Sequence, residues 1–256
     1  MKYSIDHLVI EVTRRCNMYC DHCLRGDAQN IDLDLSHVRE LFKHVGQIRT
    51  LTLTGGEPSL VPHIIEDIVK EAEAAQVSID RFYMVTNAKQ VTPEFLKSVL
   101  SLYLYCDSID DEAGSVLDIS NDGHHEDVEP DNVKMLMAFR FTGKKSSKDG
   151  VRFDQYDGRN KPTILMEGRG RAYEGRNVST SCFLLEDDDT INEAEFYMNV
   201  NGDVLGECNL SYESQDKLKI ANVHDEDFDP MQAAQKWNDL LEPNGIAELI
   251  NGEVSE

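Results

Sequence analysis

The stretch DHLVIEVTRRCNMYCDHC, residues 6–23, joins a run that favours a β-strand over 6–13 to three closely spaced cysteines. Cys16, Cys20 and Cys23 follow the spacing C-x3-C-x2-C. If the 6 cysteines of the chain were scattered at random over its 256 positions, this spacing would occur in roughly one chain in 300. Coincidence is therefore a poor explanation, and a disulfide, a zinc site and an iron–sulfur cluster are the alternatives.

The three alternatives differ in the ligands that they need. A disulfide leaves one of three thiols over, and a zinc site usually has four protein ligands. His22 offers a fourth ligand but lies between two of the cysteines, and no second C-x2-C pair exists. Three thiolates on an iron–sulfur cluster leave one iron open for a substrate or cofactor. The spacing alone favours a cluster and leaves zinc as the second choice.

Length and charge narrow the class of protein. The 256 residues suffice for one large domain, with or without an appendage. Lys and Arg total 25 against 48 Asp and Glu, and the net charge of -23 disfavours binding to nucleic acid. No run of about 18 apolar residues is present, so no membrane span is expected. The N-terminal residues indicate a strand rather than a signal peptide, and we expect a cytoplasmic protein with reduced thiols.

Short apolar runs alternate with amphipathic segments through the first 140 residues, which predicts a parallel sheet or barrel built from β/α units. The expected strands cover 6–13, 49–56, 81–87 and 115–122. The expected helices cover 35–46, a segment that begins at Pro58, 92–100 and 130–140.

The pattern loosens after Phe141. We expect a polar loop over 142–150, then a fifth strand at 151–156 and a sixth at 162–168. Further on, 193–207 predicts a hairpin that turns at Asn201-Gly202. A last helix is expected to begin at Asp229-Pro230.

A second motif, TGGEP at 54–58, ends the second strand. Gly55 and Gly56 leave the backbone uncovered, so a polar ligand can approach it closely, and Glu57 and Pro58 then open a helix. Both motifs lie where parallel strands end, which is where α/β folds build active sites. A cysteine triplet with a residue such as His22 before its last cysteine, followed by this GGEP segment, resembles the radical S-adenosylmethionine (SAM) superfamily.

Two further positions resemble the superfamily by their place. Asn87, in VTNAK after the third strand, resembles its TNG segment, with Ala88 in place of the glycine. Ser120 and Asp122, in DISND after the fourth strand, resemble its S-x-D stretch. The resemblance implies that Gly55, Gly56, Glu57, Pro58, Asn87, Ser120 and Asp122 bind SAM. Arg140 is a less specific candidate for the SAM carboxylate and equally fits a solvated helix face.

The resemblance also implies the fold and the chemistry. The fold would be α/β, a partial (β/α)6 TIM-like barrel with parallel strands, plus a small C-terminal β-hairpin/helix extension. Cys16, Cys20 and Cys23 would hold a 4Fe–4S cluster whose fourth iron binds SAM. Reductive cleavage of SAM would give a 5′-deoxyadenosyl radical that abstracts hydrogen from a substrate. A flavodoxin or ferredoxin type of protein would donate the electron.

The C-terminal region resembles the SPASM or twitch group of this superfamily. EGRGRA at 167–172 is similar to the link found in that group, and NVNGDVLGEC, which ends at Cys208, is similar to a segment that ligates an auxiliary cluster. The spacing departs from the family pattern, Cys182 lies far upstream, and two thiols are too few for such a cluster. We expect Cys106 to be a buried apolar residue, Cys182 and Cys208 to be structural, and the domains to be 1–178 and 179–256.

Three functions remain open at this stage. The first is a radical SAM enzyme that modifies a peptide or protein side chain, with a separate recognition protein as partner. The second is a radical SAM enzyme for a small molecule or nucleoside precursor, similar to the carboxydeazaguanine synthases. The third is a non-catalytic metal-binding regulatory protein. No residue is assigned to catalysis, and His124 and His125 are left out of the site as a pair typical of exposed loops.

Overall fold

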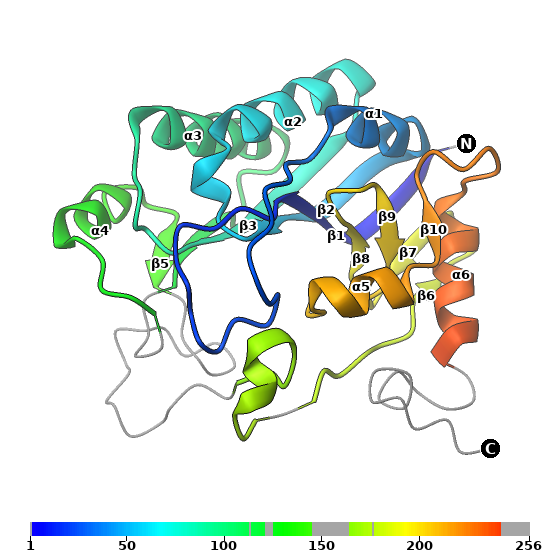
Figure 1. The fold of residues 1–256 in the computed structure, drawn as a ribbon. Coiled ribbons are helices and arrows are strands. Elements are labelled where there is room, and N and C mark those ends of the chain that lie inside the picture. The colour runs from blue at the N-terminus through cyan, green and yellow to red at the C-terminus, as the bar shows by residue number, and fades with distance from the viewer. Residues whose placement is uncertain (1, 113, 121–124, 145–163, 176, 242–256) are drawn as a thin grey trace.

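A mostly parallel β-sheet runs through the computed structural model, which describes residues 2–112, 114–120, 125–144, 164–175 and 177–241 (Figure 1). The strands lie in the order β10-β9-β8-β1-β2-β3-β4-β5, and β6 and β7 pair beside β1. The strands are β1 (Tyr3–Thr13), β2 (Val45–Gly55), β3 (Ser78–Thr86), β4 (Val116–Ile119), β5 (Thr142–Lys144), β6 (Leu184–Leu185), β7 (Thr190–Asn192), β8 (Phe196–Met198), β9 (Asp203–Leu205) and β10 (Ala221–Asn222). The run from β1 to β5 is parallel throughout, which confirms the predicted α/β class and is consistent with an open, partial barrel.

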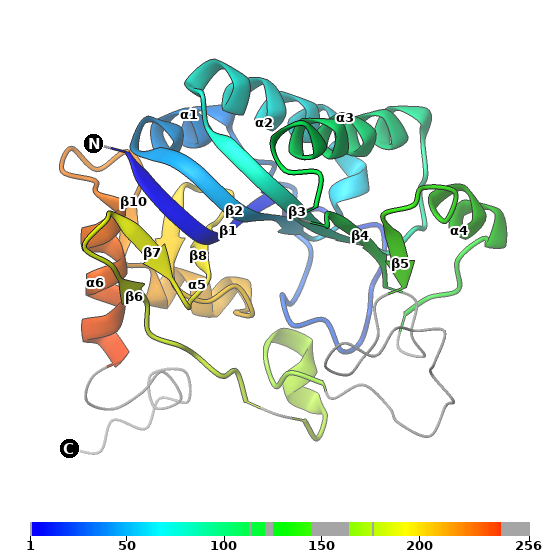
Figure 2. The ribbon, with the colours of Figure 1, turned by 180° about the vertical axis from the view of Figure 1, so that it is seen from behind.

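Helices α1, α2 and α3 cover one face of this sheet (Figures 1 and 2). Their apolar residues face the strands; Val38, Leu41 and Phe42 of α1 are fully buried. Caps define where they begin: the Asp34 side chain accepts from the Ser36 amide, and the Thr92 hydroxyl accepts from the Phe95 amide. The helical segments are α1 (Leu35–His44), η1 (Pro58–Leu60), α2 (Pro62–Ala75), α3 (Pro93–Ile109), α4 (Pro130–Leu136), η3 (Gly168–Ala172), α5 (Tyr212–Leu218) and α6 (Pro230–Leu241).

The C-terminal region joins the same sheet. Strands β8 and β9 form the predicted antiparallel hairpin, and its turn includes Gly202 at a φ of 76°. Strand β8 also pairs in parallel with β1, with Val9 opposite Tyr197. Helix α6 packs its buried Trp237 against Gly206, where a Cβ atom would lie 2.4 Å from the indole nitrogen. The hairpin/helix extension is therefore present and continues the sheet beside β1, while the domain boundary at 178/179 stays a prediction.

Several predicted elements differ from the structure, among them α3, which runs to Ile109, beyond the predicted 100. The fifth strand is β5, within the segment expected to be a polar loop; its residues are polar, and pairing with β4 (Leu117 opposite Thr142) stabilises it. The strand expected at 151–156 lies outside the described residues. The described part of the expected sixth strand, 164–168, makes only an isolated bridge at Leu165 and leads into η3. Helix α4 ends at Leu136, earlier than the predicted 140.

The described helices include none that combines the length and the apolar character needed to cross a bilayer.

Candidate active site

The three cysteines lie on the loop over residues 14–26, which we call the cysteine loop. It starts at the carboxyl end of β1, where the GGEP turn (residues 55–58) contacts it. The amide of Gly56 donates to the carbonyl of Thr13 at 2.7 Å, and the amide of Glu57 donates to the carbonyl of Arg15 at 2.8 Å. The two glycines permit this approach. A Cβ atom at Gly55 would lie 2.2 Å from the carbonyl oxygen of Thr13, and one at Gly56 would lie 2.2 Å from that of Arg15.

This contact changes the interpretation of the two glycines. The sequence suggested that they leave the backbone open for a ligand. In the structure, the amides of Gly56 and Glu57 already donate to the backbone of Thr13 and Arg15. The GGEP turn therefore sets the position of the loop just before Cys16.

Glu57 is buried, with 2% of its surface exposed, and links the ends of β2 and β3. Its Oε1 accepts from the Thr86 hydroxyl at 2.7 Å and the Ser59 amide at 3.0 Å, and its Oε2 accepts from the Asn87 amide at 2.8 Å. Burial raises the pKa of this carboxyl, although these donors oppose the shift. Pro58 directly follows as the first residue of η1 and is buried. Glu57 thus fixes the backbone of Asn87 at the end of β3.

Asn87 reaches the cysteine loop from the end of β3. Its side-chain nitrogen donates to the Asn17 side chain at 2.9 Å and lies 4.0 Å from the sulfur of Cys16. Ser120 follows β4, and its hydroxyl lies 3.1 Å from Nε2 of His125, whose ring stacks edge-on against His22 of the cysteine loop. The structure brings Asn87 into the site and Ser120 to its border, and Asp122 lies outside the described residues.

Arg140 lies elsewhere. Its side chain is 75% exposed and pairs at 3.1 Å with Asp107 of α3, so it is a surface residue rather than part of the site.

The three thiols are free and half-buried. Burial, followed by the neighbouring thiols, raises the pKa of Cys20 to about 11, and burial also raises the pKa of Cys16. The three sulfurs do not all come within 4.8 Å of one another. A single zinc ion with Zn–S bonds of about 2.3 Å would hold its thiolates roughly 3.8 Å apart. A cluster spreads its ligands over separate irons, so this wider arrangement fits a cluster better than one zinc ion.

The EGRGRA segment, which the sequence did not place in the site, closes over the cysteine loop. Arg169 donates to the carbonyls of Cys20 (3.0 Å) and Gly26 (2.7 Å) and stacks over the ring of Tyr19 at 3.9 Å. The Arg169 amide donates to the carbonyl of Cys23. Gly168 is required there, because its φ is 52° and a Cβ atom would lie 2.4 Å from the Leu24 carbonyl. The arginine between two glycines, Gly168-Arg169-Gly170, was the available signal in the sequence.

A buried ion pair ties the same loop to the C-terminal region. Arg14 donates to Glu11 at 3.0 Å and to the side chain of Gln215, on α5, at 2.9 Å. Its guanidinium also stacks on Tyr212, 4.5 Å from the ring centroid. The cysteine loop is therefore held by residues from both halves of the chain.

The family comparison agrees with this geometry. A family model described as the radical SAM superfamily matches residues 10–143, just over half of the chain. The matched range contains the three cysteines, the GGEP turn and Asn87.

Curated relatives match over shorter stretches. The uncharacterized protein MJ0907 from Methanocaldococcus jannaschii is 29% identical over 104 residues, which cover 39% of this chain and 36% of the relative. A GTP 3′,8-cyclase from Chlorobaculum tepidum is 37% identical over 89 residues, which cover 33% of this chain and 26% of the relative. The alignments thus span about a third of the length of these relatives.

Solved structures share the fold over most of the chain. Native anSMEcpe with bound AdoMet and Cp18Cys peptide matches with a TM-score of 0.53 at 12% identity, covering 92% of this chain and 82% of that one. The complex of the same protein with AdoMet and Kp18Cys peptide matches with a TM-score of 0.55 at the same identity and coverage. At this identity the likeness is one of fold.

Proposed function

The chain belongs to the radical SAM superfamily, and from this premise we propose that Cys16, Cys20 and Cys23 bind a 4Fe–4S cluster beside a SAM site. Enzymes of this superfamily use these two cofactors, and this chain is such an enzyme, so the non-catalytic alternative is set aside. When bound, the cofactors supply a 5′-deoxyadenosyl radical that abstracts hydrogen from a substrate. The observation that carries the assignment to residues is the half-buried cysteine loop, held between the GGEP turn and Asn87.

The residues of the chain orient and shield these groups. The GGEP turn binds the backbone just before Cys16 and Arg169 binds the carbonyl of Cys20, so the loop is fixed at two points along the cysteine motif. The backbone of the GGEP turn at Gly55, Gly56 and Pro58, the Asn87 side chain and the Ser120 hydroxyl are the polar groups that we assign to SAM, together with Asp122. Glu57 contributes by fixing Asn87 rather than by offering a free oxygen.

For the substrate we propose a peptide or protein side chain. The support is a fold shared over most of the chain with an enzyme crystallised with peptides, and a C-terminal hairpin and helix that continue the sheet beside β1. A separate recognition protein, an electron donor of the flavodoxin or ferredoxin type and a cytoplasmic location remain predictions.

A small-molecule substrate is the second candidate. The match to a GTP 3′,8-cyclase favours it, although that match covers 33% of this chain. The net charge of -23 speaks against a triphosphate, because anionic substrates are drawn to basic clefts.

The release of 5′-deoxyadenosine above the background of substrate-free enzyme distinguishes the two candidates. The enzyme, reconstituted anaerobically with iron and sulfide, would be given SAM and dithionite together with either a pool of synthetic peptides that contains every side chain or GTP. We expect stimulation by the peptide pool and a mass change in one of its members. Stimulation by GTP alone would contradict the peptide assignment and favour the second candidate.

A further inference from the structure

The face of the sheet opposite the helices is lined with polar side chains. Residues alternate between the two faces of a strand, so Leu8 and Leu51 face one side and His7 and Thr52 the other. His7 Nε2 lies 2.8 Å from the Thr52 hydroxyl oxygen. Further along this face, the Tyr83 hydroxyl lies 3.3 Å from an oxygen of Asp118. We call this polar side the inner face.

The β8–β9 hairpin adds two carboxylates to the inner face. Tyr197 pairs with Leu205 across the hairpin, and this register, continued past the strand ends, puts Glu195 opposite Glu207. The pairing of β8 with β1 places Glu195 beside His7, whose Nδ1 lies 3.9 Å from Oε1 of Glu195. Like charges directly opposite each other on paired strands destabilise a sheet unless a proton or a cation lies between them.

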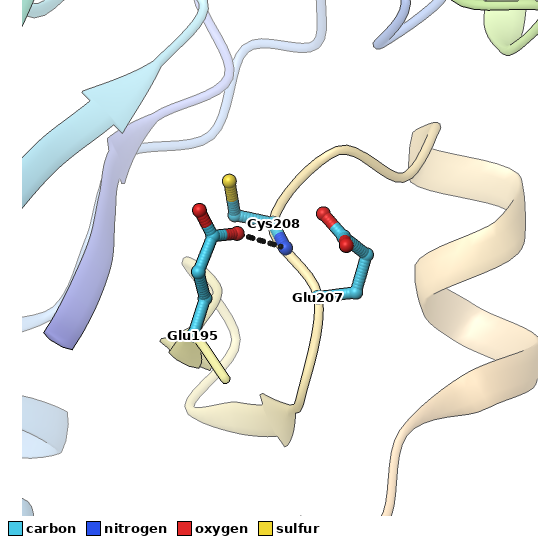
Figure 3. A group of neighbouring side chains, drawn as sticks. All are labelled: Glu195, Glu207 and Cys208. Atoms are coloured by element: carbon cyan, nitrogen blue, oxygen red, sulfur yellow. Dashed lines mark hydrogen bonds between the residues drawn. The ribbon is translucent and has the colours of Figure 1, made fainter. Parts of the chain in front are cut away.

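Cys208 completes this group (Figure 3). One carboxylate oxygen from each glutamate and the Cys208 sulfur all lie within 4.8 Å of one another. The amide of Cys208 donates to Oε2 of Glu195 at 3.1 Å, which fixes the two residues relative to each other. Figure 3 shows the two carboxylates on either side of Cys208.

Glu207 is the residue that lacks a full set of partners. Only 6% of its surface is exposed, and its Oε1 accepts from the amide and the side chain of Asn209. No described residue donates a hydrogen bond to its Oε2. Oε2 keeps some contact with solvent, and a positive group that met it would stabilise the otherwise enclosed carboxylate.

The nearby cation is already committed to other contacts. Arg25 is buried and donates to the Leu210 carbonyl at 2.7 Å, and its guanidinium stacks over the Tyr197 ring at 5.4 Å. No described residue forms a salt bridge with Glu207, and Glu195 has only the distant His7. Glu207 is buried and Glu195 is 29% exposed, and their carboxylates converge with the Cys208 thiol beside Arg25, which forms no salt bridge with either glutamate.

We propose that Glu195, Glu207 and Cys208 bind a divalent transition-metal ion, Zn²⁺ or Fe²⁺. A borderline ion of this kind accepts a thiolate and carboxylates together, whereas Mg²⁺ and Ca²⁺ take oxygen ligands. Ligands at about 2.0–2.3 Å from one ion lie roughly 3.3–3.8 Å apart, so rotation of the glutamate side chains would close the site. Three protein ligands leave a coordination position open toward the inner face, where an oxygen or nitrogen atom of the substrate can bind.

The same residues do not suit an auxiliary iron–sulfur cluster. The group offers one thiol, while such clusters usually take four. Cys182 is exposed and does not belong to the group. The site is therefore a mononuclear one that shares no ligand with the three loop cysteines and needs no SAM to bind its ion.

Cobalt(II) is the probe that tests this site. The full chain carrying Cys16→Ala, Cys20→Ala and Cys23→Ala would be titrated anaerobically with Co²⁺, followed by competition with Zn²⁺. We expect one Co²⁺ per chain and a thiolate-to-cobalt charge-transfer band. Cys208→Ser should abolish the band, and Glu195→Gln with Glu207→Gln should weaken binding by about tenfold or more. Cys182→Ser is the matched control and should leave both unchanged.

Two outcomes would overturn the proposal: no saturable cobalt band, or equal loss of the band in Cys182→Ser and Cys208→Ser. If the triple variant does not fold, as judged by circular dichroism, the wild-type chain with its cluster reconstituted serves instead. There, zinc analysis after desalting should give one Zn²⁺ per chain, and Cys208→Ser should lose the zinc while keeping about four irons. Neither measurement uses SAM, so the result does not depend on whether SAM cleavage is confirmed.

Discussion

Replacing Arg169 with alanine should loosen the loop that holds the three cysteines. The side chain donates to the carbonyls of Cys20 and Gly26, forms an ion pair with Asp27 at 2.7 Å, and stacks on Tyr19. Asp27 is 81% exposed, so its ion pair adds little. Water can replace part of the two charge-assisted hydrogen bonds, so we expect a net loss of about 2 kcal/mol. That corresponds to about a 30-fold shift toward the open loop.

The rate at which an iron chelator strips the reconstituted chain measures this opening. Absorbance near about 400 nm, which reports the cluster, should decay about 30-fold faster for Arg169→Ala than for the wild type when iron leaves through the open loop. Arg169→Lys should fall between the two, because lysine keeps the charge and loses the planar fork. Arg39→Ala removes a half-exposed arginine on α1 and is the control. Equal decay rates in Arg169→Ala and Arg39→Ala would refute the reasoning.

Three further predictions follow from the same loop and its supports. Gly56→Ala puts a Cβ atom 2.2 Å from the Arg15 carbonyl, so iron per chain after reconstitution should fall to less than about half of the wild-type value. Gly46→Ala, whose Cβ atom would lie 3.3 Å from the Lys2 side chain rather than against the cysteine loop, should lower it much less. Glu57→Gln turns an amide NH2 toward hydrogen-bond donors and should lower the free energy of unfolding by about 2–3 kcal/mol in urea titrations. An unchanged urea midpoint would contradict the role of Glu57 in fixing Thr86 and Asn87. The raised pKa of Cys20, about 11, leaves its thiol protonated at neutral pH, so alkylation of Cys20 in the apo chain should accelerate about tenfold per pH unit from pH 7 to 10, and a plateau below pH 9 would contradict it.

Elements with strong local signals were predictable from the sequence. The strands that became β1 to β4 carry apolar runs, and α1 and α3 carry caps at Asp34 and Thr92. The hairpin at Asn201-Gly202 has the turn residues that its register needs. Strand β5 has no such signal, because Thr142–Lys144 contains no apolar residue and its place in the sheet follows from backbone pairing with β4.

The candidate site was predictable where its motifs are local, and not where it depends on distant contacts. The three cysteines and the GGEP turn are each short, local motifs, and the folded chain brings the two motifs together. Two contacts arise only in the folded chain. Gly56 leaves room for the carbonyl of Arg15, and Arg169 binds the carbonyls of Cys20 and Gly26, which lie more than 140 residues before it in the sequence. The same is true of Glu195 and Glu207, which the hairpin register places opposite each other.

The central claim is that the three loop cysteines hold the cluster at which SAM is cleaved. Its most direct test is the 5′-deoxyadenosine released by the reconstituted chain with SAM and dithionite, compared among the wild type, the Cys16→Ala/Cys20→Ala/Cys23→Ala variant and the Cys182→Ser control. The wild type and Cys182→Ser should release it at similar rates, and the triple variant should release none above a blank without protein. Equal release by the triple variant and the wild type would contradict the claim.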